Sequence, residues 1–208
     1  MITTLYLTRH GETEWNVEKR LQGHKDSSLT PRGVLQAAWL GEMLYPVSFH
    51  CIYSSSSERA RRTAEIIRGK KTAPVLICDQ LREIHMGDWE GMTGSRIQDR
   101  VPDEYYSFWN TPHLYQPTNG GETFFELYDR VVPWLNGKLS EHQGQCLLIV
   151  THAITLKLIM GCLQSRPLNE LWAPPLLPPA SLCKVVIEDG DVKVMLYGDT
   201  SHFREIKM

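Results

Sequence analysis

Short apolar runs alternate with segments of helical periodicity along most of the chain. The runs typical of strands are rich in β-branched and aromatic residues and end at polar or turn residues; they cover residues 3–8, 51–54, 74–78, 146–150, 181–187 and 192–197. The segments typical of helices repeat apolar residues every three or four positions; they cover residues 31–44, 58–68, 122–139 and 153–163. This alternation predicts an α/β fold, a three-layer α/β/α sandwich around a mostly parallel sheet.

Local signals mark the ends of several of these helices. Thr30 is a suitable cap for the first helix, and Pro31 suits its first position, where a backbone N–H is not needed. Gly69 marks the end of the second helix, and Pro133 is expected to kink the third. One apolar stripe of the first helix is predicted to face the core; it consists of Leu35, Ala38, Trp39, Leu40, Met43 and Leu44.

Two parts of the chain depart from this alternation. Residues 84–120 are weakly patterned and rich in aromatic side chains, and we expect a lid-like insertion of loops and short helices over the sheet edge. Near the C-terminus, an Asp-Gly pair within residues 188–191 favours a tight turn between the last two strands. The sequence therefore predicts a single domain, residues 1–208, with a C-terminal antiparallel hairpin.

Composition narrows the class of partner. Hydrophobic residues make up 42% of the 208 residues and charged residues 22%, which is typical of a folded chain rather than a disordered one. The formal net charge of −2 gives no general attraction to nucleic acid or to an anionic membrane. The sequence shows no signal-peptide pattern and no apolar stretch long enough to span a bilayer. Five scattered cysteines with no metal-binding or redox spacing favour a reduced, cytoplasmic protein.

Two of the predicted strands end in a histidine. His10 follows the first strand, in Thr8-Arg9-His10, and His152 follows another, in Val150-Thr151-His152. Ligand sites of α/β sheets lie just beyond the carboxyl ends of the strands. If these two strands are parallel neighbours, the two imidazoles meet at one edge of the sheet. Gly11, directly after His10, is free to take a positive φ and turn the chain away.

Basic and acidic side chains are predicted near the same edge. Arg59 falls in the first turn of a helix that follows the serine run 54–57, and a helix N-terminus favours an anion. An arginine there is unfavourable for the helix dipole, so a role other than helix stability is indicated. The loop after the third strand adds the carboxylates of Glu83, Asp88 and Glu90, each a candidate proton donor on chemistry alone.

These residue types are a consistent set for phosphoryl transfer. Arginines bind a phosphate dianion through paired hydrogen bonds. One neutral histidine can attack phosphorus to give a phosphohistidine, while the second stabilises charge on the equatorial oxygens. A carboxylic acid can protonate the leaving oxygen and later activate water. Neighbouring arginines would also lower the pKa of the attacking histidine.

The segment Arg9-His10-Gly11-Glu12-Thr13 resembles the signature of the histidine phosphatase superfamily, also called phosphoglycerate mutase-like. Further blocks similar to those of the family follow in order along the chain: Leu29-Thr30-Pro31-Arg32-Gly33, Ser54-Ser55 with Arg59-Ala60, Leu81-Arg82-Glu83, Gly87-Asp88-Trp89-Glu90-Gly91, Gly121-Glu122-Thr123 and Val150-Thr151-His152. One departure is Ala153, where relatives usually have glycine; alanine is a good helix residue, so we expect little loss.

This resemblance implies a role for each matching residue. His10 is implied as the phosphorylated nucleophile, His152 as the second histidine of the pocket and Glu83 as the proton donor. Arg9 and Arg59 are implied as the two arginines that hold the phosphoryl group. The substrate-binding set implied by the family consists of Arg9, Asn16, Gln22, Arg59 and His152. The resemblance implies no metal ion and no other cofactor.

Several reactions are compatible with such a site. Family mutases carry an Arg-His-Tyr-Gly segment after the proton donor, whereas here Ile84-His85-Met86-Gly87 stands in that place and favours hydrolysis. We therefore expect a phosphatase of broad specificity for small phosphomonoesters, similar to the broad-specificity phosphatases of bacilli. The alternatives are mutase-type transfer, the ribazole phosphatase reaction of cobalamin synthesis, a metal hydrolase, and a phosphate-binding module without turnover. The aromatic residues of 105–115 form either a substrate lid or only a small core of their own.

Overall fold

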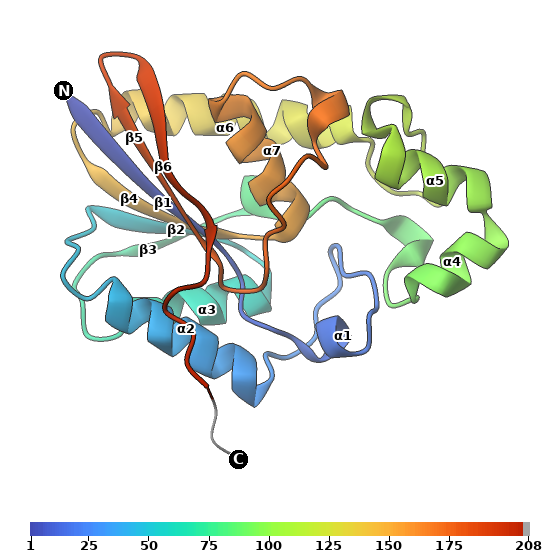
Figure 1. Ribbon diagram of the computed structural model, residues 1–208, viewed down its shortest axis with the longest axis horizontal. Helices are drawn as coiled ribbons and strands as arrows, with labels where there is room; N and C mark the ends of the chain where they lie inside the picture. Colours follow the sequence, from blue (N-terminus) through green and yellow to red (C-terminus); the bar gives the residue numbers. More distant parts are fainter. Residues whose placement is uncertain (206–208) are drawn as a thin grey trace.

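The fold is built around one six-stranded mixed sheet with the strand order β3-β2-β4-β1-β5-β6. The computed structural model describes residues 1–205 of the chain (Figure 1). The strands are β1 (Ile2–Arg9), β2 (Cys51–Ser55), β3 (Val75–Cys78), β4 (Cys146–Thr151), β5 (Leu182–Glu188) and β6 (Asp191–Asp199). Neighbouring strands are parallel from β3 to β1, and β5 and β6 add antiparallel pairs at the other edge. The predicted α/β class and C-terminal hairpin are confirmed.

Helices cover both faces of the sheet. On one side lie α2 (Pro31–Met43) and α3 (Glu58–Arg68), and on the other lie α6 (Phe124–Glu141) and α7 (Ala153–Leu163) (Figure 1). Successive residues of a strand point to opposite faces, so each central strand contributes to two separate cores. In β4, for example, Leu147 and Ile149 join the core under α6 and α7, whereas Leu148 and Val150 join the core under α2 and α3.

Helix α2 and the residue after it bury only part of the predicted apolar stripe, Leu40 and Leu44. The residues that it buries are Gly33, Gln36, Ala37 and Leu40. Leu35 and Met43 of the predicted stripe are each 38% exposed. The reason is close packing on α3: a Cβ built on Gly41 would lie 3.1 Å from the carbonyl oxygen of Ile67. Small residues set the contact between these two helices, and the larger apolar side chains are left at its margins.

Short elements fill the connections. After β1 comes α1 (Glu14–Val17), a single turn where a polar loop was expected, with Thr13 and Asn16 forming a capping box at its start. The chain after β3 continues through η1 (Asp79–Leu81), η2 (Gly87–Trp89), α4 (Gly94–Arg100), α5 (Pro102–Asn110) and η3 (Pro112–Leu114), and η4 (Leu168–Glu170) follows α7. In Figure 1, α4 and α5 stand at the right-hand end of the molecule, away from the C-terminal hairpin.

Two further predictions concern Pro133 and the hairpin. Helix α6 runs through Pro133 as one continuous helix. At the hairpin, Asp189 has φ 50° and Gly190 has φ 94°, as in the type I′ turn that suits the twist of two antiparallel strands. Within residues 1–205, no helix combines the length and apolar character needed to cross a membrane.

Candidate active site

The register of the sheet brings the two strand-end histidines together. Strands β1 and β4 are parallel neighbours in which Arg9 pairs with Thr151. His10 and His152 are therefore the next residue on each strand, and the backbone N–H of His10 donates to the carbonyl of Thr151 at 2.9 Å. Their imidazole centroids lie 5.2 Å apart, with the ring planes inclined at 59°. Both side chains are buried.

The hydrogen bond of His10 leaves one of its ring nitrogens free as a nucleophile. Nδ1 lies 2.7 Å from the carbonyl oxygen of Gly11, and a carbonyl can only accept, so Nδ1 carries the proton of the neutral ring. The lone pair is then on Nε2. Burial and the nearby guanidinium groups of Arg59 and Arg9 hold the pKa of His10 well below its usual value. The imidazole is thus kept neutral, as nucleophilic attack requires.

His152 is oriented by a serine at the end of the neighbouring strand. Its Nε2 lies 2.7 Å from Ser55 Oγ, which itself accepts the backbone N–H of Ser57 at 3.3 Å. When the serine hydroxyl donates its hydrogen to Nε2, the ring proton lies on Nδ1. Burial, Arg59 and then His10 hold the pKa of His152 well below its usual value.

Three buried donors in this region have no partner within the described residues: Arg9 Nε, Arg59 Nε and His152 Nδ1. A buried donor without a partner is costly in a folded protein, and such groups are expected where a ligand supplies the acceptor. Burial, opposed by Glu83 and assisted by Arg59, lowers the pKa of Arg9 to about 10. The guanidinium still carries its charge at neutral pH. The region is therefore cationic, dry and rich in free N–H groups, which suits an anion.

Arg59 is held from behind by the loop after α1. Its Nη1 donates to the carbonyl of Lys25 at 3.0 Å and to Asp26 Oδ1 at 2.5 Å, and its Nη2 donates to the carbonyl of Gly23 at 2.7 Å. The other oxygen of Asp26 accepts the backbone N–H of Glu58 at the start of α3. Of the five guanidinium donors, these contacts leave the Nε hydrogen and one on Nη2 for a ligand.

Glu83 lies at the start of the helix that follows His152. Oε2 accepts the backbone N–H of Ile154 at 3.0 Å, and Oε1 accepts that of Thr155 at 3.0 Å. His152 is the N-cap residue of α7 and makes no capping bond with its side chain. Glu83 therefore supplies the acceptors that the first turn of α7 needs, and this places its carboxylate beside the second histidine.

The other two candidate carboxylates are placed differently. Asp88 is exposed, whereas Glu90 is buried. The Glu90 carboxylate accepts the backbone N–H groups of His24, Lys25 and Met86. These contacts hold the loop that carries Asp26.

Asn16 and Gln22 line the segment next to His10 but are engaged with their own loop. Asn16 Oδ1 accepts the backbone N–H of Thr13, so only its amide nitrogen remains for a phosphoryl group. Gln22 is buried, accepts the hydroxyl of Thr13 and donates to Ser27. Their direct contact with substrate stays a prediction.

Gly11 is needed for close approach rather than for a positive φ, contrary to the prediction. It does not have a positive φ. A Cβ built on Gly11 would lie 2.5 Å from the carbonyl oxygen of Gly33. The backbone after His10 thus passes directly over the first turn of α2, and its N–H donates to the Thr63 hydroxyl of α3 at 3.0 Å. A side chain at this position would push His10 out of place.

Sequence reasoning missed Ser55, Asp26 and Thr63. Each acts through a partner distant in sequence, so no short motif marks its role. The one signal for Ser55 is the serine run 54–57 at a strand end, which predicts backbone N–H donors there. Ser55 instead contributes its hydroxyl to His152.

Two aromatic residues of 105–115 belong to the core under α6 and α7. Phe108 and Tyr115 are buried, and their ring centroids lie 5.0 Å apart in an edge-to-face arrangement. Phe108 also packs on Phe124 of α6 and on Trp172. These contacts join the insertion to the main core, so its aromatic residues do not form a separate core of their own. A lid role for residues 84–120 stays a prediction.

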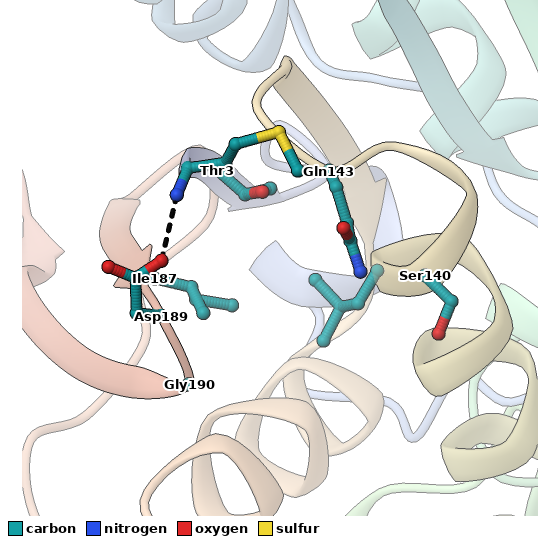
Figure 2. A pocket seen from close by; sticks show the side chains of 8 residues that line it. Thr3, Ser140, Gln143, Ile187, Asp189 and Gly190 are labelled. Carbon is teal, nitrogen blue, oxygen red and sulfur yellow. Dashed lines mark hydrogen bonds and ion pairs between the residues drawn. The ribbon is translucent and has the colours of Figure 1, made fainter.

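A cavity of about 320 Å³ lies elsewhere, at the amino end of β1. Figure 2 shows it lined by residues such as Thr3, Ser140, Gln143 and Asp189. The terminal ammonium group of Met1 pairs with Asp189 at 2.8 Å on its rim. None of the predicted site residues lines this cavity. Within residues 1–205, no cluster of three or more His, Cys, Asp or Glu side chains has the arrangement of a metal site.

Comparison with known proteins identifies the class to which this fold and this site belong. The model of the histidine phosphatase superfamily (branch 1) matches residues 5–200, and the chain belongs to this family. Among solved structures, YhfR of Bacillus stearothermophilus is 44% identical, with a TM-score of 0.91 and coverage of 96% of this chain and 98% of that one.

Curated relatives carry several activities. The adenosylcobalamin/alpha-ribazole phosphatase of Escherichia coli is 36% identical over 81% of this chain and 82% of its own length. The metal-independent phosphoserine phosphatase of Arabidopsis thaliana is 33% identical over 99% of this chain and 85% of its own. The probable phosphoglycerate mutase GpmB of Salmonella choleraesuis is 39% identical over 81% of this chain and 77% of its own.

Proposed function

We propose that this chain is a phosphomonoester phosphatase of broad specificity that works through a covalent phosphohistidine at His10. The observation that carries the proposal is the set of buried, partnerless donors on Arg9, Arg59 and His152 beside the free Nε2 of His10. A phosphoryl group supplies acceptors for all three donors and an electrophilic phosphorus for the nitrogen. Relatives that are phosphatases support the same reaction class.

In the proposed reaction, His10 Nε2 attacks phosphorus and the bond from phosphorus to the leaving oxygen breaks. Glu83 gives its proton to that oxygen, so an alcohol departs. Glu83, now a carboxylate, takes a proton from water, which attacks the phosphohistidine and breaks the N–P bond. His152 Nδ1–H and the two arginines stabilise charge on the equatorial oxygens throughout.

The segment after Glu83 supports hydrolysis with little selection among leaving groups. Ile84 and Met86 are buried in the core, so His85 is the polar side chain that remains where family mutases supply an arginine and a tyrosine. A site with few fixed polar groups around the leaving group discriminates weakly. The expected substrates are small phosphomonoesters, with no nucleic-acid or membrane partner.

The nucleophile is tested with His10→Asn, in which the amide nitrogen can still donate to Gly11. Turnover of p-nitrophenyl phosphate should fall by about a thousandfold or more, because no group replaces the attacking nitrogen. In the native protein, rapid quenching during turnover should trap phosphate that is acid-labile and alkali-stable. Retained turnover in the variant, or no trapped phosphate in the native protein, would contradict the phosphohistidine route.

A substrate panel tests the class of reaction. We expect hydrolysis of p-nitrophenyl phosphate, phosphoserine, ribazole phosphate and 3-phosphoglycerate, unchanged by EDTA. Interconversion of 2- and 3-phosphoglycerate without phosphate release would indicate the mutase. Hydrolysis confined to ribazole phosphate would indicate that narrower phosphatase, and loss of activity in EDTA a metal hydrolase. Binding of phosphate with no turnover of any ester would leave only a binding module.

The cellular compartment is a proposal of the same kind. All five cysteines are free thiols, and Cys51 and Cys183 are buried in the core. Such cysteines suit the reducing cytoplasm, where thiols persist.

A further inference from the structure

The segment that carries Glu83 has no helix or strand of its own to hold it. Residues 83–86, between η1 and η2, form no regular element. Their backbone groups are largely buried with the side chains of Glu83 and Ile84. Buried carbonyls without a helix or sheet need other donors. The supply of those donors decides where the Glu83 carboxylate stands.

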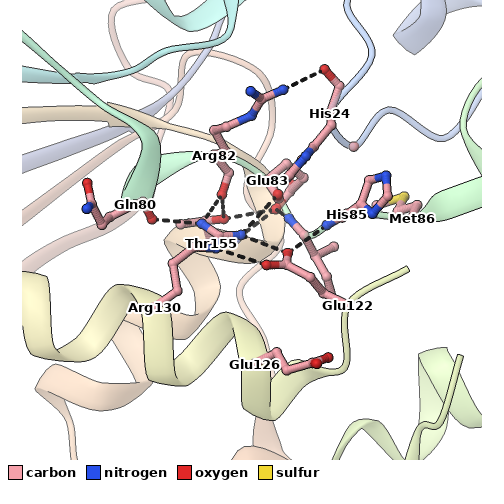
Figure 3. Close-up of polar contacts among 12 residues, drawn as sticks. His24, Gln80, Arg82, Glu83, His85, Met86, Glu122, Glu126, Arg130 and Thr155 are labelled. Carbon is pink, nitrogen blue, oxygen red and sulfur yellow. Dashed lines mark hydrogen bonds and ion pairs between the residues drawn. The ribbon is translucent and has the colours of Figure 1, made fainter. Parts of the chain in front are cut away.

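Arg130 of α6 supplies donors to the first carbonyl of this segment and to two carbonyls just before it. Its Nη1 donates to the carbonyls of Gln80 at 2.8 Å and Arg82 at 3.0 Å, and its Nη2 donates to that of Glu83 at 3.3 Å. Nε and Nη2 also donate to the two carboxylate oxygens of Glu122, at 3.0 and 2.8 Å. All five N–H groups of the guanidinium are therefore used (Figure 3).

Glu122 extends the same network to the far end of the segment. Its Oε2 accepts the backbone N–H of His85 at 2.8 Å, and its own N–H donates to the carbonyl of His85 at 2.8 Å. Burial alone would raise the pKa of Glu122, but the hydrogen bonds from Arg130 and from His85 outweigh it and the pKa is lowered. Glu122 is therefore a carboxylate at neutral pH, matched to the charge of Arg130.

The two ends of Glu83 are thus fixed by different helices. Its carboxylate is held by the first turn of α7, through Ile154 and Thr155. Its carbonyl is held by Arg130 of α6. The hydroxyl of Thr155 lies 2.8 Å from the carbonyl of Arg82, which Arg130 also contacts. Figure 3 shows these groups converging on one short stretch of backbone.

We propose that Arg130 and Glu122 are positioning residues for proton transfer: they hold the backbone at 80–85 so that the Glu83 carboxyl group faces the leaving oxygen. The inference rests on the proposed role of Glu83. Neither residue touches the phosphoryl group in this scheme. Loosening them should impair the step that needs a proton and leave phosphate binding intact.

The test uses the full chain with Arg130→Met, Arg130→Lys and Glu122→Gln, and two substrates of different leaving group. Lysine keeps the charge but cannot provide the guanidinium fork. For phosphoserine, whose alkoxide leaves poorly, kcat/KM should fall by about tenfold more than for 2,4-dinitrophenyl phosphate, which needs no protonation. The ratio kcat/KM is used because it reports the phosphorylation step alone, whereas hydrolysis of the phosphohistidine is common to both substrates. The inhibition constant of inorganic phosphate should stay within about twofold of the native value.

Lys138→Met is the matched control. Lys138 lies on the same helix and pairs with Glu141 at 2.6 Å. Its replacement should therefore not lower turnover of one substrate more than that of the other. If circular dichroism shows that Arg130→Met does not fold, the test is made with Arg130→Lys and Glu122→Gln. Equal losses for the two leaving groups, or a weakened phosphate affinity that accounts for the whole loss, would overturn the proposal.

Glu83→Gln separates this inference from the proposed function. A loss of kcat/KM confined to phosphoserine in Glu83→Gln, together with equal losses in the Arg130 and Glu122 variants, would reject the positioning role alone. If kcat/KM of Glu83→Gln shows no dependence on the leaving group, Glu83 is not the proton donor, and its proposed role fails together with the positioning role.

Discussion

At the scale of single residues, the site is defined by which hydrogen-bonding groups are used and which are left free. In His10, Nδ1 is hydrogen-bonded to the carbonyl of Gly11 and Nε2 is free. In His152, Nε2 is hydrogen-bonded to Ser55 and Nδ1 is free. With Ser55 donating to Nε2, both imidazoles carry their proton on Nδ1, but a different nitrogen is left free in each: Nε2 in His10 and Nδ1 in His152. This difference is not visible in the residue names, because it depends on partners supplied by the fold.

Removing the partner of His152 should weaken catalysis. In Ser55→Ala, Nε2 loses its hydrogen bond, and the ring is free to take the tautomer with its proton on Nε2 and to rotate. We expect kcat/KM for p-nitrophenyl phosphate to fall by about 10- to 100-fold, corresponding to the loss of one buried hydrogen bond. Ser54→Ala is a suitable comparison, because Ser54 donates only to the carbonyl of Ser55. An unchanged kcat/KM in Ser55→Ala would show that Ser55 does not orient the ring.

At the scale of elements, the sequence predicts the ends of helices better than the faces that they bury, because helix ends depend on local signals and buried faces on long-range contacts. Helices α3 and α7 have the bounds that the pattern predicts, and Thr30 caps α2 as expected through a hydrogen bond to the N–H of Gly33. These signals lie within a few residues of the helix ends. The buried face of α2 is not predictable in the same way, since it depends on the close approach of α3 at Gly41, which the periodicity of α2 does not show.

Helix α6 offers a prediction about stability. Pro133 is exposed inside this helix, and an interior proline removes a backbone hydrogen bond and crowds the preceding turn. Pro133→Ala should therefore raise the free energy of unfolding by about 1–3 kcal/mol. Urea titration followed by circular dichroism measures this. A decrease would mean that the helix is shaped around the proline and relies on its rigidity.

At the scale of the whole molecule, the site collects one part from each layer. The histidines come from the sheet, Arg59 from α3 on one face, and Glu83 from a segment held by α6 and α7 on the other. The sequence predicts each of these residues because they match family motifs at strand and helix ends, and their roles in the reaction stay predictions. The sequence does not predict Asp26 behind Arg59 or Arg130 behind Glu83. Those contacts join residues 33 and 47 positions apart and leave no local pattern.

The buried histidines predict how stability depends on pH. His10 and His152 have pKa values lowered well below the ordinary one, so at pH values below about 6.5 the unfolded chain binds protons that the folded chain does not. Their contribution to stability is fully present above that pH and is lost as the pH falls. Between about pH 6.5 and 5, each histidine should lower the free energy of unfolding by up to about 1.4 kcal/mol per pH unit.

This slope can be measured by urea titration at a series of pH values. His10→Asn removes one of the two groups, so its stability should decline less steeply over the same interval. The exposed His50 has no such burial, and His50→Asn should keep the native slope. An identical slope in native protein and His10→Asn would show that His10 takes up protons equally in the folded and unfolded states.

The pairing of Arg9 with Thr151 has a consequence for how the pocket is built. Neighbouring strands of a sheet lie about 4.8 Å apart, and the two imidazoles that continue these strands are separated by 5.2 Å. The distance between the two imidazoles is therefore set by the backbone, through the spacing of the strands. A one-residue insertion in either strand would turn its histidine to the opposite face, where no rotamer change could bring it back. The sheet thus fixes the spacing of the two imidazoles before any ligand binds.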